Sequence, residues 1–262
     1  MKCGTTSLYY YLAEHPEIGM SHRKETDFFL ATHGAWDRGR DWYTRQFPTE
    51  VPELGECAPN YTKRHLFDDV PTRIESICPD VKLIYLVRDP IERTISHYRG
   101  SRRDGREQRS FEAAVADVDT SNYVLTSRYH FQLQPYLEQF SGEDLLVVTA
   151  EELDSAPTST LRTIYRFLDV NPAFENQRVG RRFNDSVGKK KLAPWTRWLS
   201  RQVPQSLKDR TRPYLPLHWL PGERIPRPEV SPETRARLEA VFRPDVEALR
   251  DLTGRDFSAW SV

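Results

Sequence analysis

The sequence predicts an α/β fold in which a central parallel sheet is flanked by helices. Two short runs of apolar and β-branched residues, 82–87 (KLIYLV) and 145–149 (LLVVT), have the composition of strands that are covered on both faces. Segments with helical spacing precede, separate and follow these two runs. This alternation of helices and strands is typical of a parallel sheet with helices on both of its faces.

The first two helices are predicted from apolar spacing and from proline positions. Residues 5–14 (TTSLYYYLAE) place apolar side chains on one face, and Pro16 ends the segment because the residue before a proline avoids the helical region. A second helix is expected from Ile91 to about Arg99. Pro90 stands at its first turn, where proline is tolerated.

The second half of the chain contains two further helices and a proline-rich segment. A turn from Asp154 to Pro157 is expected to lead into a helix at 160–168. Eight prolines between 194 and 232 exclude one long helix there. Segment 194–232 is expected to wrap the surface or to form part of a substrate lid, with a connector as the alternative. Segment 233–262 is predicted to be a packing helix, with Pro244 as a break or kink.

Composition narrows the class of protein. The 262 residues fit one domain, 1–262, and the equal numbers of basic and acidic residues, 38 each, disfavour binding to nucleic acid or to a membrane surface. The three cysteines lack metal-site spacing and suit a reducing compartment. No apolar run approaches the roughly 20 residues of a membrane span, and no signal peptide is recognised. These features predict a cytoplasmic protein.

The first candidate site is the start of the first helix. A glycine and three small hydroxyl residues there present backbone N–H groups and the positive end of the helix dipole, which suit a phosphate or sulfate. Lys2 adds a point charge beside these residues, which are Gly4, Thr5, Thr6 and Ser7. An ordinary capped helix is the alternative. The Walker A pattern GxxxxGK[ST] is absent, which disfavours ATP-dependent phosphoryl transfer.

The second candidate site directly follows the strand predicted at 82–87. Ligands of open α/β sheets bind beyond the carboxyl ends of the strands, and Arg88 stands at such an end, where it can bind phosphate through two hydrogen bonds. Ser96 can donate its hydroxyl to the same group from the following helix. The alternative is a structural ion pair between Arg88 and Asp89.

These motifs resemble those of a known family. Lys2–Leu8 is similar to the 5′-phosphosulfate loop of sulfotransferases that use 3′-phosphoadenosine 5′-phosphosulfate (PAPS), and Arg88–Tyr98 matches their 3′-phosphate motif RDPxxRxxSxY. Residues 24–29 (KETDFF) resemble the KExxFF segment of carbohydrate-type and bacterial members. Residues 55–61 (GECAPNY) resemble the strand that carries the catalytic glutamate. The similarity spans nearly the whole chain and implies a P-loop-NTPase-like central parallel sheet.

The resemblance implies a transfer of the sulfuryl group from PAPS to an acceptor hydroxyl or amine, by in-line displacement and without a metal. Lys2 would neutralise charge on the bridging oxygen, and Glu56 would take the proton from the acceptor. The 5′-phosphosulfate would be held by Gly4, Thr5, Thr6 and Ser7. The 3′-phosphate and the adenine would be bound by Arg88, Ser96 and Lys190. The acceptor would be oriented by Lys24 and Asp27.

Some of these assignments have alternatives. Glu56 needs burial to raise its pKa if it is to act as a base, and it could instead be a structural carboxylate that pairs with Lys24 or Lys2. The reserve candidates for the base are His22, His97 and His130. The lysine that often follows the catalytic glutamate in glycosaminoglycan enzymes is Cys57 here, so a small carbohydrate, a lipid or a natural product is expected as acceptor rather than a heparan-like polymer.

The start of the chain departs from the family pattern. Relatives have a strand before the phosphosulfate loop, whereas Met1 directly precedes Lys2 here. The sheet is therefore expected to lack its first strand, and Met1 is interpreted as an internal methionine or the result of trimming. Two other functions stay open: a non-catalytic protein that binds PAPS or adenosine bisphosphate, and a kinase that requires ATP and Mg²⁺. The sequence does not indicate an oligomeric state.

Overall fold

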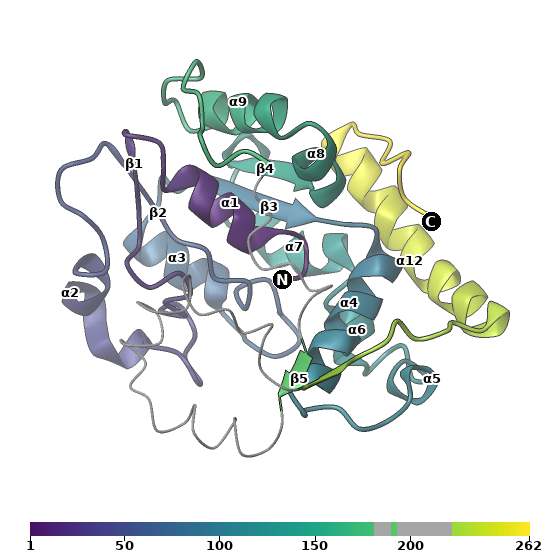
Figure 1. The fold of residues 1–262 in the computed structure, drawn as a ribbon. Coiled ribbons are helices and arrows are strands. Elements are labelled where there is room, and N and C mark those ends of the chain that lie inside the picture. Colours follow the sequence, from purple (N-terminus) through teal and green to yellow (C-terminus); the bar gives the residue numbers. More distant parts are fainter. Residues whose placement is uncertain (181–189, 193–221) are drawn as a thin grey trace.

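The computed structural model describes residues 1–180, 190–192 and 222–262 (Figure 1). Its strands are β1 (Ile18–Met20), β2 (Glu53–Gly55), β3 (Leu83–Val87), β4 (Leu145–Thr149), β5 (Lys190–Leu192) and β6 (Gly222–Arg224). Its longer helices are α1 (Thr5–Leu12), α2 (Gly39–Thr44), α3 (Val70–Ile77), α4 (Pro90–Arg103), α7 (Tyr129–Leu137), α8 (Ala150–Ser155), α9 (Pro157–Phe167) and α12 (Pro232–Thr253). Short turns of helix are α5 (Phe111–Ala114), α6 (Asn122–Leu125), η1 (Trp36–Arg38) and η2 (Gly142–Asp144).

Strands β1 to β4 pair in parallel, as the sequence predicts. β3 pairs with β4 over its whole length, from Leu83 opposite Leu145 to Val87 opposite Thr149. β1 pairs with β2 in the same sense. Within the part of the chain that the structure describes, no ladder of hydrogen bonds joins these two pairs, so the single continuous sheet that we expected is divided into two.

Helices cover both faces of the β3–β4 pair, which confirms the α/β class. Side chains alternate between the faces of a strand. Leu86 and Val148 pack in one apolar cluster with residues of α1, α8 and α9. Tyr85 and Val147 pack on the opposite face with residues of α4, α7 and α12. The continuous apolar composition of both strands follows from this double coverage.

The boundaries of α4 and α8 follow from their first residues. Asp89 caps α4 because its Oδ1 accepts the Glu92 N–H at 2.9 Å, and Pro90 occupies the first turn. α4 runs one turn further than the predicted end near Arg99. The turn predicted from Asp154 is wrong in part, because Thr149 and Glu152 form a capping box that starts α8 directly after β4.

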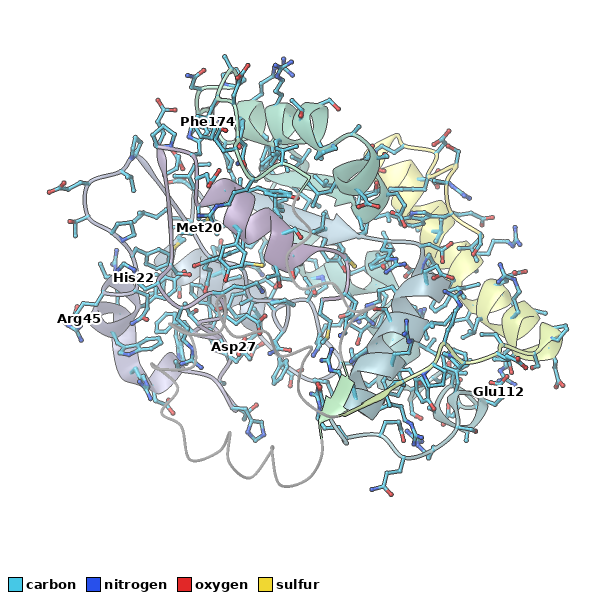
Figure 2. All side chains as sticks on the ribbon, in the orientation of Figure 1. Met20, His22, Asp27, Arg45, Glu112 and Phe174 are labelled. Carbon is cyan, nitrogen blue, oxygen red and sulfur yellow. The ribbon has the colours of Figure 1, made fainter. Side chains whose placement is uncertain are left out.

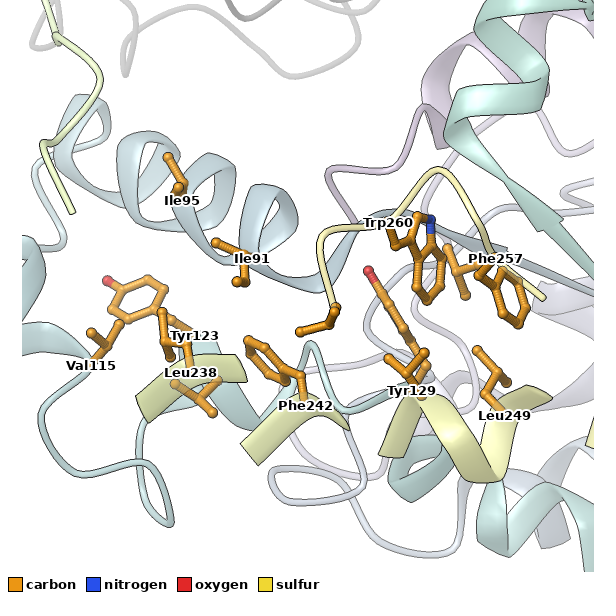
Figure 3. Close-up of a cluster of buried hydrophobic side chains, with 14 of the residues drawn as sticks. Ile91, Ile95, Val115, Tyr123, Tyr129, Leu238, Phe242, Leu249, Phe257 and Trp260 are labelled. Atoms are coloured by element: carbon orange, nitrogen blue, oxygen red, sulfur yellow. The ribbon is translucent and has the colours of Figure 1, made fainter. Parts of the chain in front are cut away.

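α12 continues through Pro244, so a break, the first of the two predicted alternatives, is wrong. A proline inside a helix costs about 3 kcal/mol, but each large apolar side chain that is fully buried contributes about 1.5–3 kcal/mol. Leu238, Phe242 and Leu249 of α12 are all fully buried in one cluster (Figure 3). The helix predicted for 233–262 is also too long, since Gly254 adopts φ 65° and ends it. Residues 254–262 form a non-helical tail.

The proline-rich segment predicted as a surface or lid segment, 194–232, lies mostly outside the described residues, as does the side chain of Lys190. The backbone of Lys190 belongs to β5, which pairs antiparallel with β6 and lies beside α4 (Figure 1). No helix in the described ranges is both long and apolar enough to cross a membrane.

Candidate functional site

The glycine of the first motif has the geometry that an anion-binding loop requires. Gly4 stands at the N-cap of α1 with φ 92°, a left-handed conformation that costs a residue with a side chain far more than it costs glycine. No side chain caps this helix end. The first turn of a helix leaves backbone N–H groups without partners in the helix, so the start of α1 can accept an anion.

The side chain of Lys2 extends from this loop to α4. A Cβ atom placed on Gly100 would lie 2.5 Å from the Lys2 Nζ, so the ammonium group occupies the space beside that glycine. Ser96 lies one turn earlier on the same face of α4, about 6 Å along the helix axis. The structure therefore brings Lys2 of the first motif to α4, one helical turn beyond Ser96 of the second.

The surroundings of Lys2 disfavour its positive charge. Burial, followed by the charge of Arg103, lowers the pKa of Lys2 to about 8. Among the described residues no carboxylate forms an ion pair with Lys2. A cation that is desolvated in this way gains much from an anionic ligand, because the ligand supplies the missing counter-charge.

Arg88 lies at the carboxyl end of β3, but it does not pair with Asp89. Its Nη2 lies 3.6 Å from Glu92 Oε2, whereas the Asp89 carboxylate caps α4. Glu92 also accepts a hydrogen bond of 2.8 Å from Arg227, and this hydrogen bond is the main reason that the pKa of Glu92 is lowered. Arg227 lies far along the chain and belongs to no motif, so its role cannot be predicted from the sequence.

The second arginine of the RDPxxRxxSxY motif has a structural role. Arg93 is 1% exposed. Its Nε donates to the Met1 carbonyl at 3.3 Å, and its Nη1 donates to Ser127 Oγ at 3.2 Å. Arg93 therefore ties the phosphosulfate loop and the end of α6 to α4.

Glu56 lies at the end of β2 in a cluster of hydroxyl groups. Its carboxylate accepts hydrogen bonds from Tyr61 at 2.9 Å, from Tyr43 at 3.1 Å and from Thr26. Burial raises the pKa of Glu56 although these three hydrogen bonds lower it. The ion-pair partners expected for a structural Glu56 are wrong, because among the described residues neither Lys24 nor Lys2 pairs with it, and Lys24 pairs with Glu25 at 2.8 Å. Tyr43, Tyr61 and Thr26 were missed because their roles depend on tertiary packing.

The KETDFF segment lies beside Glu56 on the loop that follows β1. The Thr26 hydroxyl reaches Glu56, and the Lys24 carbonyl accepts the Cys57 N–H at 3.2 Å. Figure 2 shows Asp27 on this loop. The Asp27 carboxylate accepts a hydrogen bond from Asn60 at 3.2 Å, and burial raises its pKa. Glu25 is the more exposed carboxylate, with 49% of its side chain accessible.

Lys63 is a buried cation that the sequence analysis did not identify. Its Nζ donates to Asn60 Oδ1 at 2.7 Å, and burial, followed by the charge of Arg93, lowers its pKa to about 8. Lys63 and Asp27 therefore bind the same amide side chain. Asn60 thus joins Lys63 to Asp27 of the predicted acceptor segment.

Among the described residues, no hydrogen bond joins the three reserve histidines to Glu56 or to its hydroxyl partners. His97 is buried and 3.3 Å from Arg93 Nη1, and burial lowers its pKa well below the usual value. His130 lies at the start of α7, where Asp245 of α12 accepts its backbone N–H at 3.0 Å. His22 is exposed on the loop after β1 (Figure 2).

Comparison with known proteins gives one family. A model of the sulfotransferase domain matches residues 1–250. The chain is 27% identical over 265 residues to the heparan sulfate glucosamine 3-O-sulfotransferase 3A1 of Mus musculus, covering 98% of the chain and 61% of that protein. It is 28% identical over 207 residues to the bifunctional heparan sulfate N-deacetylase/N-sulfotransferase 2 of Homo sapiens, covering 71% of the chain and 23% of that protein. The chain thus spans less than two thirds of either relative.

A solved structure extends the similarity to the fold. The sulfotransferase from Alicyclobacillus acidocaldarius superposes with a TM-score of 0.70 at 25% identity. The superposition covers 100% of this chain and 95% of that chain.

Proposed function

The chain belongs to the sulfotransferase domain family, and from this premise we propose that it transfers a sulfuryl group from PAPS to a hydroxyl or amine of a carbohydrate acceptor. The donor carries two anionic ends, the 5′-phosphosulfate and the 3′-phosphate. We assign the first to the start of α1 and the second to Arg88 and Ser96. Lys190 is proposed to close over the 3′-phosphate and adenine.

One observation carries this proposal. The Lys2 ammonium lies against Gly100, one helical turn from Ser96. A cation of the first motif therefore lies along the face of α4 that carries a hydroxyl of the second motif, which supports a ligand with two anionic groups. The arrangement of a loop, a helix N-terminus and parallel strands also supports a P-loop-like fold.

The proposed reaction assigns one task to each group. The acceptor oxygen or nitrogen attacks sulfur in line with the bond to the bridging oxygen, and Glu56 takes the acceptor proton. Lys2 stabilises the negative charge that develops on the bridging oxygen as the S–O bond breaks. This interaction is strongest in the transition state and so lowers the barrier. Lys24 and Asp27 are proposed to orient the acceptor.

The proposed acceptor class rests on the relatives. Both relatives described above are named for heparan sulfate. A glucosamine-containing saccharide presents both hydroxyl and amine groups. Because Cys57 replaces the lysine of the glycosaminoglycan enzymes, we propose a short or weakly charged saccharide rather than a long polyanion.

The proposal is tested by transfer of labelled sulfate. The protein is incubated with sulfur-labelled PAPS and a panel of glucosamine saccharides, desulfated heparan and simple alcohols, and labelled products are identified. Label in a saccharide supports the proposal. Binding of adenosine 3′,5′-bisphosphate without transfer to any acceptor would instead indicate the non-catalytic binding protein. Dependence on ATP and Mg²⁺ would indicate a kinase.

The substitution Gly100→Ala should lower the activity without lowering the stability. The added methyl group must displace the Lys2 ammonium, since the two would lie 2.5 Å apart. Alanine inside a helix is favoured over glycine by about 1 kcal/mol. We therefore expect an unchanged or raised melting temperature together with a kcat that falls at least about tenfold. A variant with wild-type kcat would show that the position of Lys2 beside α4 does not matter for catalysis.

The pH profile of kcat/KM should be bell-shaped. At low pH the Glu56 carboxylate, whose pKa is raised by burial, becomes protonated and cannot accept a proton. As the pH rises through about 8, Lys2 loses the charge that stabilises the bridging oxygen. Lys2→Arg should shift the basic limb upward, because arginine stays protonated. If the basic limb of the Lys2→Arg profile stays at the wild-type pH, the limb reports the ionisation of another group, such as Lys63.

A further inference from the structure

The backbone N–H and the backbone carbonyl of Arg88 both form hydrogen bonds with one hydroxyl group. Tyr129 Oη donates to the Arg88 carbonyl at 2.7 Å and accepts the Arg88 N–H at 3.2 Å. Tyr129 belongs to α7, is 2% exposed and lies in neither anion motif. β3 and its ladder end at Val87, so Arg88 has no strand partner for these two backbone groups. Tyr129 satisfies both of them.

The same hydroxyl also contacts the first motif. Tyr129 Oη lies 3.9 Å from the Sγ of Cys3, the residue between Lys2 and Gly4. Cys3 is 1% exposed, so the contact is sealed from water. One side chain therefore touches the loop assigned to the 5′-phosphosulfate and the residue assigned to the 3′-phosphate.

The C-terminal tail, residues 254–262, contacts both Tyr129 and the residue that follows Arg88. The ring of Trp260 lies 5.7 Å from the ring of Tyr129, and Phe257 stacks on Trp260 at 4.4 Å (Figure 3). The next residue, Ser261, donates its backbone N–H to Asp89 Oδ2 at 2.6 Å. Since Asp89 caps α4 through its other carboxylate oxygen, the tail holds the turn between β3 and α4.

We propose that Tyr129 and the C-terminal tail form a clamp that positions Arg88 for the 3′-phosphate, with Tyr129 as the positioning residue. A guanidinium recognises phosphate through hydrogen bonds of fixed geometry, so its position matters as well as its charge. The clamp sets the backbone of Arg88 relative to the phosphosulfate loop before the nucleotide binds. This inference rests on the proposed function, because it deepens the assignment of the 3′-phosphate site.

The test compares two nucleotides that differ only in the 3′-phosphate. Calorimetric Kd values are measured for adenosine 3′,5′-bisphosphate and for AMP with Tyr129→Phe, which removes the hydroxyl alone. We expect the Kd for the bisphosphate to rise about tenfold, the effect of losing about one hydrogen bond to a charged group. The Kd for AMP should change by less than about twofold, because AMP makes no contact with Arg88.

Tyr136→Phe is the matched control. Tyr136 is buried on the same helix, and its hydroxyl also donates to a backbone carbonyl, that of Tyr61, at 2.8 Å. Loss of the Tyr136 hydroxyl should leave the Kd values for the bisphosphate and for AMP unchanged. Melting temperatures of both variants report the purely structural cost of losing a buried hydroxyl.

Ser261→Pro tests the same clamp at an exposed residue, and it decides the question if Tyr129→Phe does not fold. Proline removes the N–H that binds Asp89, and the preference for the bisphosphate should again fall. The clamp is refuted if both Kd values rise by the same factor or if neither changes. Absence of a preference in the wild-type protein would refute the proposed function itself, whatever Tyr129 does.

Discussion

Replacing Lys2 with methionine is expected to lower kcat by about 100- to 1000-fold, the range found when one preorganised group that stabilises developing charge is removed. Methionine keeps the length of the side chain and removes its charge. In the wild-type protein the ammonium is desolvated and has no carboxylate partner among the described residues. Its charge is therefore available to the bridging oxygen as the S–O bond breaks. The KM for PAPS should rise by a smaller factor than kcat falls, because the interaction is strongest in the transition state.

The control for this variant is Lys82→Met. Lys82 precedes β3 and pairs with Asp169 at the surface, and 81% of the Asp169 side chain is exposed. Loss of such a surface ion pair costs at most about 1 kcal/mol of stability, and kcat should stay at the wild-type value. Steady-state kinetics with labelled PAPS measure both variants. A Lys2→Met enzyme with a kcat within about threefold of wild type would exclude Lys2 from the chemical step.

Replacing Glu56 with glutamine is expected to lower kcat by about 100- to 10,000-fold, the contribution of a general base. The amide has the same shape as the carboxylate, and the hydroxyls of Tyr43, Tyr61 and Thr26 can rotate to donate or accept. The fold should therefore survive, and the melting temperature checks this. The acidic limb of the pH profile should disappear with the carboxylate, since its raised pKa is the cause of that limb.

Glu25→Gln is the matched comparison for Glu56. Glu25 lies next to Thr26, whose hydroxyl binds Glu56, and its side chain is more exposed and paired with Lys24. If Glu56 is the base, Glu25→Gln should retain most of the activity. A loss of activity that is larger in Glu25→Gln than in Glu56→Gln would transfer the role of base to Glu25. Glu56 would then be a buried structural carboxylate that shapes the loop.

Local patterns were enough to predict β3, β4 and the start of α4, but not β1 or α7. The apolar runs before Arg88 and before Ala150 place β3 and β4 correctly to within one residue, since buried parallel strands need apolar side chains on both faces. Pro90 marks the start of α4 because proline is both tolerated and favoured in the first turn of a helix. The family resemblance of the two motifs is confirmed by the domain match.

Other features depend on contacts between distant parts of the chain. Pro244 does not break α12, because burial of that helix outweighs the local preference of proline. Tyr129 and Arg227 carry no local signal, and only the folded chain brings them to Arg88 and Glu92. Lys63 is linked to Asp27 only through Asn60. The two hydroxyls of Tyr43 and Tyr61 meet Glu56 in the same way. The roles given to the individual site residues stay predictions, and Lys190 depends on a side chain outside the described residues.

The central claim is that one nucleotide with both a 5′ and a 3′ phosphate binds along α4, between the phosphosulfate loop and Arg88. It is tested most directly by the ratio of the Kd for AMP to the Kd for adenosine 3′,5′-bisphosphate, in the wild-type protein and in Arg88→Ala. We expect the wild-type protein to bind the bisphosphate more tightly by a factor on the order of 100, from charge-assisted hydrogen bonds to the 3′-phosphate, and we expect Arg88→Ala to bind the two nucleotides about equally. Equal binding by the wild-type protein, or a preference that Arg88→Ala retains in full, would contradict the claim.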